Sequence, residues 1–256
     1  MSKIKYNDLL DAGVHFGHLT RKWDPKIAPY IFMERNGIHI IDLNKTIVCL
    51  EDAANYIHNI VRSGRKIMFV ATKKQAKDIV AEHAQNLRMP YVTERWLGGM
   101  LTNFSTIRKS LKKMSSMEKL MKDEAYLNLA KRERLMISRE KEKLKKVLGG
   151  IADLTRLPAA LFIVDIKREH IAIKEAQKLN IPVIAMVDTN SNPELVDVPI
   201  PANDDAWKSI QLITQFIAKA VEEALMVRKK DKDDAKLVED EKAKREVDEV
   251  PAKDEA

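Results

Sequence analysis

Short apolar segments alternate with helical patterns along most of this chain, and this alternation limits its fold more than any other feature. Four segments, at residues 38–43, 66–72, 161–165 and 181–188, are apolar and rich in β-branched residues, which is typical of buried strands. Residues 91–93 form a weaker fifth candidate. Because parallel neighbours need crossover connections, the pattern predicts an α/β body with a mainly parallel five-stranded sheet and helices on both faces.

Helical stripes of apolar residues lie between these segments. The first, at residues 47–61, ends before Gly64, a typical C-terminal cap, and would join the strands at 38–43 and 66–72 into one strand-helix-strand unit. Two further stripes cover residues 73–87, with Thr72 as the expected N-cap, and residues 168–179. A last long helix is expected to begin at Asn203, whose side chain suits an N-cap.

Residues 104–148 break the alternation, because they carry two helical patterns and no strand signal. Their apolar residues recur at spacings of three, four or seven, which predicts two helices packed as an antiparallel, coiled-coil hairpin inserted into the body. The outer faces are dense in lysine and arginine. Long surface helices often carry lysine, but acids are too few here for alternating ion pairs, so the hairpin is interpreted as a basic arm that reaches phosphate backbones.

The chain is accordingly divided into three parts. The α/β body comprises residues 1–103 and 149–228, and the basic hairpin comprises residues 104–148. Residues 229–256 carry few large apolar side chains and are expected to form a disordered charged tail. The formal net charge is +7, and acids outnumber bases in the tail, so the folded part is more basic than the total and should attract polyanions.

Cysteine use and hydropathy indicate where the chain resides. The single cysteine, Cys49, cannot form an internal disulfide and lies in an apolar helical stripe, as a small core residue would. The first ten residues lack the apolar run of a signal peptide, and no stretch of about 18 apolar residues occurs. A cytoplasmic protein without a membrane partner is therefore expected.

The enzyme hypothesis rests on Asp165 and Asp188, which follow two candidate strands where α/β enzymes place catalytic groups. Standard glycine-rich phosphate loops, nucleophile elbows and HExxH motifs are absent from the sequence, and capping of local backbone also accounts for both aspartates. His15, His18, Asp188 and Asp205 would form a divalent-metal site only if the fold brought them together. No catalytic residue, metal or cofactor is assigned.

Two other segments combine aromatic, basic and glycine residues. Residues 13–25 place Trp23 among histidines and cations, and residues 94–103 place Trp96 beside two glycines at the base of the hairpin. Aromatic faces stack on unpaired bases while cations take phosphates, so both segments are candidate RNA contacts. The alternatives are a loop anchored by Trp23 and a tight glycine turn.

The order of several motifs resembles the family of small-subunit ribosomal protein two. The first are GVHFGH at residues 13–18, and PYIF followed by RNGIHIIDL within residues 29–43. The similarity continues over most of the body, at residues 69–76, 95–104, 161–165, 170–176, 181–183, 187–190 and 200–206. The middle of the hairpin and the tail do not share it.

This resemblance implies a flavodoxin-like three-layer body with an inserted helical hairpin and no enzymatic activity. It implies binding to small-subunit ribosomal RNA at the junction of head and body, late incorporation during assembly, and docking of the large multi-domain small-subunit protein that captures messenger RNA; DNA is not an expected partner. The long hairpin indicates a bacterial or plastid member. A free-standing RNA chaperone is the remaining alternative. Carried over by position, the RNA contacts are His15, His18, Arg21, Lys22, Trp23, Arg95, Trp96, Asn103, Arg108, Lys109, Lys112 and Lys113.

Overall fold

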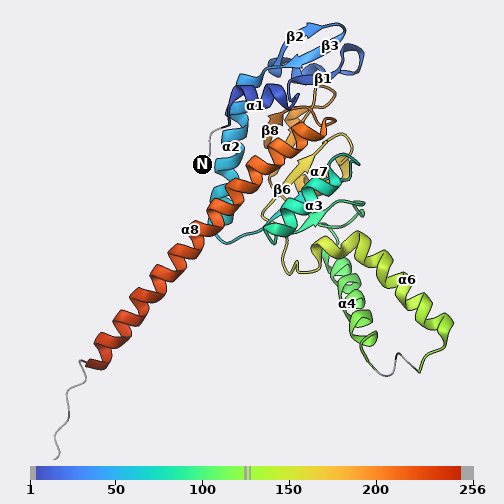
Figure 1. The fold of residues 1–256 in the computed structure, drawn as a ribbon, viewed down its shortest axis with the longest axis vertical. Coiled ribbons are helices and arrows are strands. Elements are labelled where there is room, and N and C mark those ends of the chain that lie inside the picture. The colour runs from blue at the N-terminus through green and yellow to red at the C-terminus, as the bar shows by residue number, and fades with distance from the viewer. Residues whose placement is uncertain (1–3, 124–125, 127, 249–256) are drawn as a thin grey trace, which may run out of the picture.

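A five-stranded parallel sheet forms the centre of the body. The computed structural model describes residues 4–123, 126 and 128–248 (Figure 1). The spatial order of the strands is β5 (Tyr91–Val92), β4 (Ile67–Val70), β6 (Ala160–Val164), β7 (Val183–Val187) and β8 (Val198–Pro201). Numbered from the first parallel strand, this order is 2-1-3-4-5, the flavodoxin-like arrangement. The predicted fold class is confirmed.

Helices cover both faces of this sheet and make three layers. Alternate residues of β4 point to opposite faces, so Ile67 and Phe69 pack in one core and Met68 and Val70 in the other. On the first face lie α2 (Leu43–Arg62), α3 (Lys77–Asn86) and the start of α8 (Trp207–Asp248). On the second face, α7 (His170–Lys178) packs beside the base of the hairpin.

A second, antiparallel sheet stands on the body and was not predicted. Its order is β1 (Phe16–Leu19), β3 (Ile38–Ile41) and β2 (Ile31–Arg35), and the same region contains α1 (Tyr6–Asp11), η1 (Thr20–Lys22) and η2 (Pro25–Tyr30). The prediction that residues 38–43 belong to the parallel sheet, in a unit with residues 66–72, is therefore wrong. Asn36 and Gly37 have φ values of 52° and 72°, which turn β2 back onto β3 as a hairpin.

Three other expectations need correction. Strand β8 was missed because Pro199 and Pro201 interrupt its pattern, but β8 is an edge strand, where proline is tolerated. Helix α3 begins at Lys77, so Thr72 is not its cap and instead donates its hydroxyl to Glu169. Helix α8 continues to Asp248, past the expected end near residue 228, because no glycine or proline interrupts it. Residues 249–256 of the expected tail lie outside the described residues.

The hairpin consists of α4 (Phe104–Leu120) and α6 (Lys131–Leu148), and projects from the body at the end opposite the antiparallel sheet (Figure 1). Ile107, Leu111 and Met114 are buried on the inner side of α4, as the apolar spacing predicts. Ion pairs join the two helices from Lys113 to Glu140 and from Lys141 to Glu118. The short helices η3 (Gly149–Ile151) and η4 (Pro193–Leu195) complete the body. Within the described residues, no helix has both the length and the apolar character to cross a membrane.

Candidate functional site

Charged side chains meet at the carboxyl ends of the parallel strands. Because these ends lie on one edge of a parallel sheet, loops distant in the chain converge there. Lys73 follows β4, Asp165 follows β6, and Asp188 follows β7. We call the group the carboxyl-edge cluster; its members are His18, Lys73, Asp165, Asp188, Asp204 and Asp205.

Lys73 forms ion pairs with three carboxylates of this cluster. Its Nζ atom lies 2.6 Å from Asp204 Oδ1, 2.7 Å from Asp205 Oδ1 and 3.4 Å from Asp165 Oδ2. Burial alone would lower the pKa of Lys73, but the negative charge and hydrogen bonds of the aspartates outweigh it and raise the pKa. The ammonium group therefore stays charged and holds the loops after β4 and β6 to the start of α8.

His18 connects the antiparallel sheet to the same edge. Its Nδ1 atom lies 3.1 Å from Asp188 Oδ2, its Nε2 atom lies 3.2 Å from Asp205 Oδ2, and its backbone N–H donates to Thr189 Oγ1 at 2.7 Å. The interaction with Asp188 raises the pKa of His18, burial opposes this, and the charges of the other aspartates add to it. His18 thus has a structural role that its position in the sequence did not reveal.

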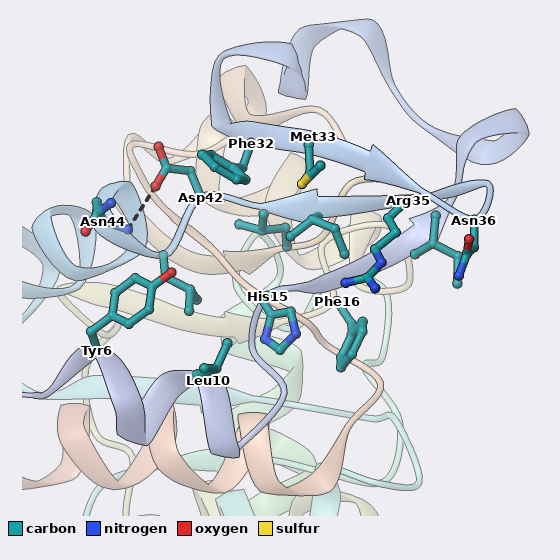
Figure 2. Close-up of a pocket in the computed structure, with 14 residues that line it drawn as sticks. Tyr6, Leu10, His15, Phe16, Phe32, Met33, Arg35, Asn36, Asp42 and Asn44 are labelled. Atoms are coloured by element: carbon teal, nitrogen blue, oxygen red, sulfur yellow. Dashed lines mark hydrogen bonds between the residues drawn. The ribbon is translucent and has the colours of Figure 1, made fainter.

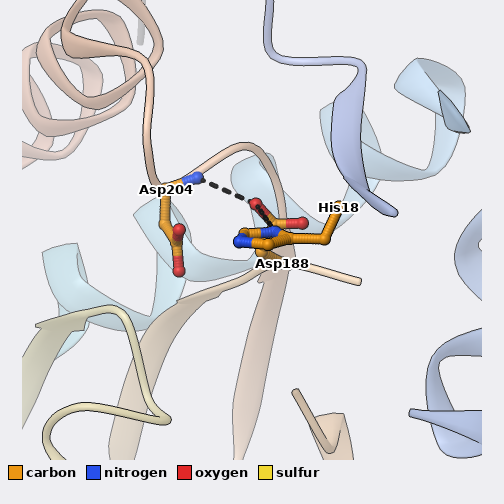
Figure 3. Close-up of side chains that lie close together, drawn as sticks. All are labelled: His18, Asp188 and Asp204. Carbon is orange, nitrogen blue, oxygen red and sulfur yellow. Dashed lines mark hydrogen bonds and ion pairs between the residues drawn. The ribbon is translucent and has the colours of Figure 1, made fainter. Parts of the chain in front are cut away.

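The arrangement could also hold a divalent cation. One ligand atom from each of His18, Asp188 and Asp204 lies within 4.8 Å of the others (Figure 3). Asp204 Oδ2 is buried and accepts no hydrogen bond from the described residues. Burial, followed by the charges of Asp188 and Asp165, raises the pKa of Asp204 to about 7. One imidazole and two carboxylates are a donor set suited to zinc or a similar ion. Of the residues named for such a site from the sequence, His18 and Asp188 belong to this set, His15 and Asp205 do not, and Asp204 takes the third place.

His15 instead lines a hollow between α1 and the antiparallel sheet, with a volume of about 600 Å³ (Figure 2). Burial lowers the pKa of His15. We call this feature the aromatic hollow, because Phe16 on β1 and Phe32 on β2 line it and are 48% and 68% exposed. Apolar surface left open in this way is typical of an interaction site. The hollow was not predicted from the sequence, since it depends on a sheet that was itself not predicted.

The predicted RNA contacts near the N-terminus lie close to His18. Arg21 and Lys22 are exposed in η1, which directly follows β1. Trp23 is 39% exposed, and its ring centroid lies 5.0 Å from that of His39. The expectation that Trp23 anchors a loop and the expectation that it presents an aromatic face are thus compatible.

The segment before the hairpin is organised around a buried carboxylate. Glu175 on α7 accepts hydrogen bonds from the Trp96 indole at 3.1 Å and from the backbone N–H groups of Gly99, Leu101 and Thr102 at 2.7–3.1 Å. Trp96 is only 7% exposed, so in this conformation it anchors the turn and offers little surface for stacking. Glu175 was not predicted from the sequence, because it lies in a helical pattern that carries no signal of RNA binding.

The remaining predicted contacts are exposed. Arg95 precedes the buried tryptophan, and Asn103 occupies the position before α4. On α4, the side chains of Arg108, Lys109 and Lys112 form no ion pair with any described residue, whereas Lys113 pairs with Glu140. The outer face of α4 therefore presents uncompensated positive charge, and Lys113 is its least available member.

Comparisons with known proteins agree with this architecture. A family model described as Ribosomal protein S2 matches residues 9–224. The chain is 72% identical to the small ribosomal subunit protein uS2 of Cytophaga hutchinsonii over 95% of this chain and 96% of that protein. It is 60% identical to the protein of the same name from Flavobacterium psychrophilum, over 100% and 96% of the two chains. It is 58% identical to the protein of the same name from Chloroherpeton thalassium, over 92% of this chain and 94% of that protein.

Proposed function

Because this chain belongs to the ribosomal protein S2 family, we propose that it binds small-subunit ribosomal RNA through the exposed cations of α4 and of the β1–η1 region. It is a structural constituent of the small ribosomal subunit and is not an enzyme. We further propose that it lies at the junction of head and body, that it is incorporated late during assembly, and that it is located in the bacterial cytoplasm.

The observation that carries the proposal is the unpaired charge on the outer face of α4. Arg108, Lys109 and Lys112 have no carboxylate partner within the described residues, so their charge is free to neutralise phosphates. Their helix is held rigidly by a buried inner side, which includes Ile107 and Leu111. A rigid cationic arm can take many phosphate contacts with little loss of conformational freedom.

The aromatic hollow supports a second part of the proposal, namely docking of the large multi-domain small-subunit protein that captures messenger RNA. Phe16, Phe32 and Met33 leave an apolar surface uncovered on a sheet that stands away from the hairpin. A protein partner would bury this surface, whereas RNA would gain little binding free energy from most of it.

Reconstitution with small subunits that lack this protein tests the RNA-binding proposal. Sedimentation over a series of salt concentrations should show binding that falls steeply as salt rises, because each neutralised phosphate releases counterions. Chemical footprinting of the bound state should protect RNA at the head-body junction. Absence of binding at low salt would refute the proposal, and protection elsewhere would refute the assigned position.

A further inference from the structure

A second pocket lies at the opposite edge of the sheet from the carboxyl-edge cluster. Its volume is about 480 Å³, and it lies between the end of α3, the starts of β4 and β5, and η3 at the base of the hairpin. We call it the amino-edge pocket; its lining includes Lys66, Gln85, Arg88, Tyr91, Gly149 and Gly150. Flavodoxin-like folds hold small ligands at the carboxyl edge, so this position is not explained by the fold.

Arg88 in this pocket has an unusual backbone conformation. Four non-glycine residues have positive φ in the described part of the chain, and three are asparagine or aspartate, which tolerate this region. Arg88, with φ of 53°, is the exception. Its N–H donates to Gln85 O at 3.0 Å and closes the end of α3, a position where glycine or asparagine is usual. A helix cap alone would not favour arginine there, so we expect the side chain of Arg88 to have a further role.

The net charge of the pocket is positive, because its two cations, Lys66 and Arg88, outnumber Asp153, the one acid in its lining. The side chains of Lys66 and Arg88 are exposed and form no ion pair with the residues that the structure describes. In the chain, η3 directly follows α6, whose last turn carries Lys145 and Lys146. Lys146 pairs with Glu94 at 3.6 Å, whereas Lys145 is exposed, so positive charge continues at Lys145 from the hairpin to this edge of the body.

The lining also offers an aromatic ring and bare backbone. The Tyr91 hydroxyl accepts a hydrogen bond from Gln85 Nε2 at 2.6 Å. A Cβ atom on Gly150 would lie 2.2 Å from Tyr91 O and 2.8 Å from its ring, so glycine is required for η3 to pack directly on Tyr91. Gly149 adds a wall without a side chain.

From these observations we propose that the amino-edge pocket binds an unpaired nucleotide of ribosomal RNA, with Lys66 and Arg88 on the phosphate and Tyr91 and Gln85 toward the base. This inference rests on the proposed function and extends it to a site outside the predicted contacts. Proteins commonly read RNA through splayed bases, which rest on aromatic or guanidinium planes. The pocket volume is within the range of small-ligand sites and is sufficient for one nucleotide.

The variants R88G and K66A test the proposal in full-length protein on small subunits that lack it. R88G should unfold at the same temperature as wild type or at a higher one, since glycine suits positive φ. It should nevertheless bind small subunits more weakly than wild type does. Together the two changes should reduce the slope of log affinity against log salt by about 2, one for each lost phosphate contact. K174A/K178A, which removes two exposed charges from α7, is the matched control and should change the slope less.

A photo-crosslinking residue at Ala152, an exposed position in the lining, identifies the occupant. Crosslinks to ribosomal RNA are expected. Crosslinks to protein alone, or unchanged binding and salt slope in R88G/K66A, would overturn this inference. If R108E/K112E still weakened binding in that case, the wider RNA-binding proposal would stand; if no form of the protein bound subunits, both would fail.

Discussion

The carboxyl-edge cluster and the outer face of α4 both concentrate charged side chains, but they differ in how the charge is compensated. Lys73 is buried among three aspartates and the half-buried His18 lies between two, so both side chains already have partners. Arg108, Lys109 and Lys112 are exposed and unpaired among the described residues. Buried pairs hold loops in place, whereas exposed unpaired cations remain available to a polyanion. Compensation, more than the number of charges, therefore separates a structural cluster from a binding surface.

The replacement K73M should give the largest effect on stability. Without the ammonium group, Asp204, which is 1% exposed, loses its lysine partner and faces the negative charges of Asp188 and Asp165. The free energy of unfolding, measured by urea denaturation, should fall by about 3–5 kcal/mol. K74M, at the exposed neighbouring position, is the control and should change little. Equal stabilities of the two variants would contradict the structural role of the cluster.

The replacement E175A should have the second largest effect on stability. It leaves the Trp96 indole and the backbone N–H groups of Gly99, Leu101 and Thr102 without their acceptor. Unfolding should become easier by about 3 kcal/mol, because buried donors without partners retain their full desolvation cost. The exposed Glu82 supplies a control, E82A, in the same assay. Hydrogen exchange of residues 97–102 should rise in E175A, and unchanged exchange would show that Glu175 does not organise this turn.

The dependence of this effect on pH is a third and smaller test. Burial raises the pKa of Glu175, but hydrogen bonds from Thr102, Leu101 and Trp96 lower it by more, so the folded pKa lies below the ordinary value of 4.5. The carboxylate then stabilises the fold above the unfolded pKa, and this contribution is lost as pH falls through the folded pKa. The difference in unfolding free energy between wild type and E175Q should shrink below pH 4.5. A difference that stays constant into acid would contradict the assignment.

The double charge reversal R108E/K112E should have the smallest effect on stability, within about 0.5 kcal/mol, because both side chains are exposed. Binding to small subunits that lack the protein should nevertheless weaken by about tenfold or more at moderate salt. The matched control is K174E/K178E on α7. Equal binding by both double variants would remove the outer face of α4 from the RNA-contact surface.

Much of the body could be predicted from local patterns, because the central strands bury both faces and therefore have continuous apolar runs in the sequence. These runs lie at residues 66–72, 161–165 and 181–188. Of the antiparallel sheet, that criterion finds only β3, since β2 is mostly exposed and its short apolar segment ends at Glu34 and Arg35. The dipeptide Asn36–Gly37, which is typical of two-residue hairpin turns, is the local signal for the hairpin of β2 and β3. Similarly, the prolines of β8 hid a strand that is stable only because it lies at an edge.

The periodicity and composition of the sequence determine the hairpin, the α/β class and the basic character of the arm, because these features depend on residues close together in the chain. The sequence alone does not determine which partners the charged residues have. His18 and Asp188 are 170 residues apart, and Glu175 lies more than 70 residues from the turn that it organises. Contacts of that kind arise when parallel strands and a helix bring distant loops to one place, so it took the folded chain to distinguish paired charges from free ones.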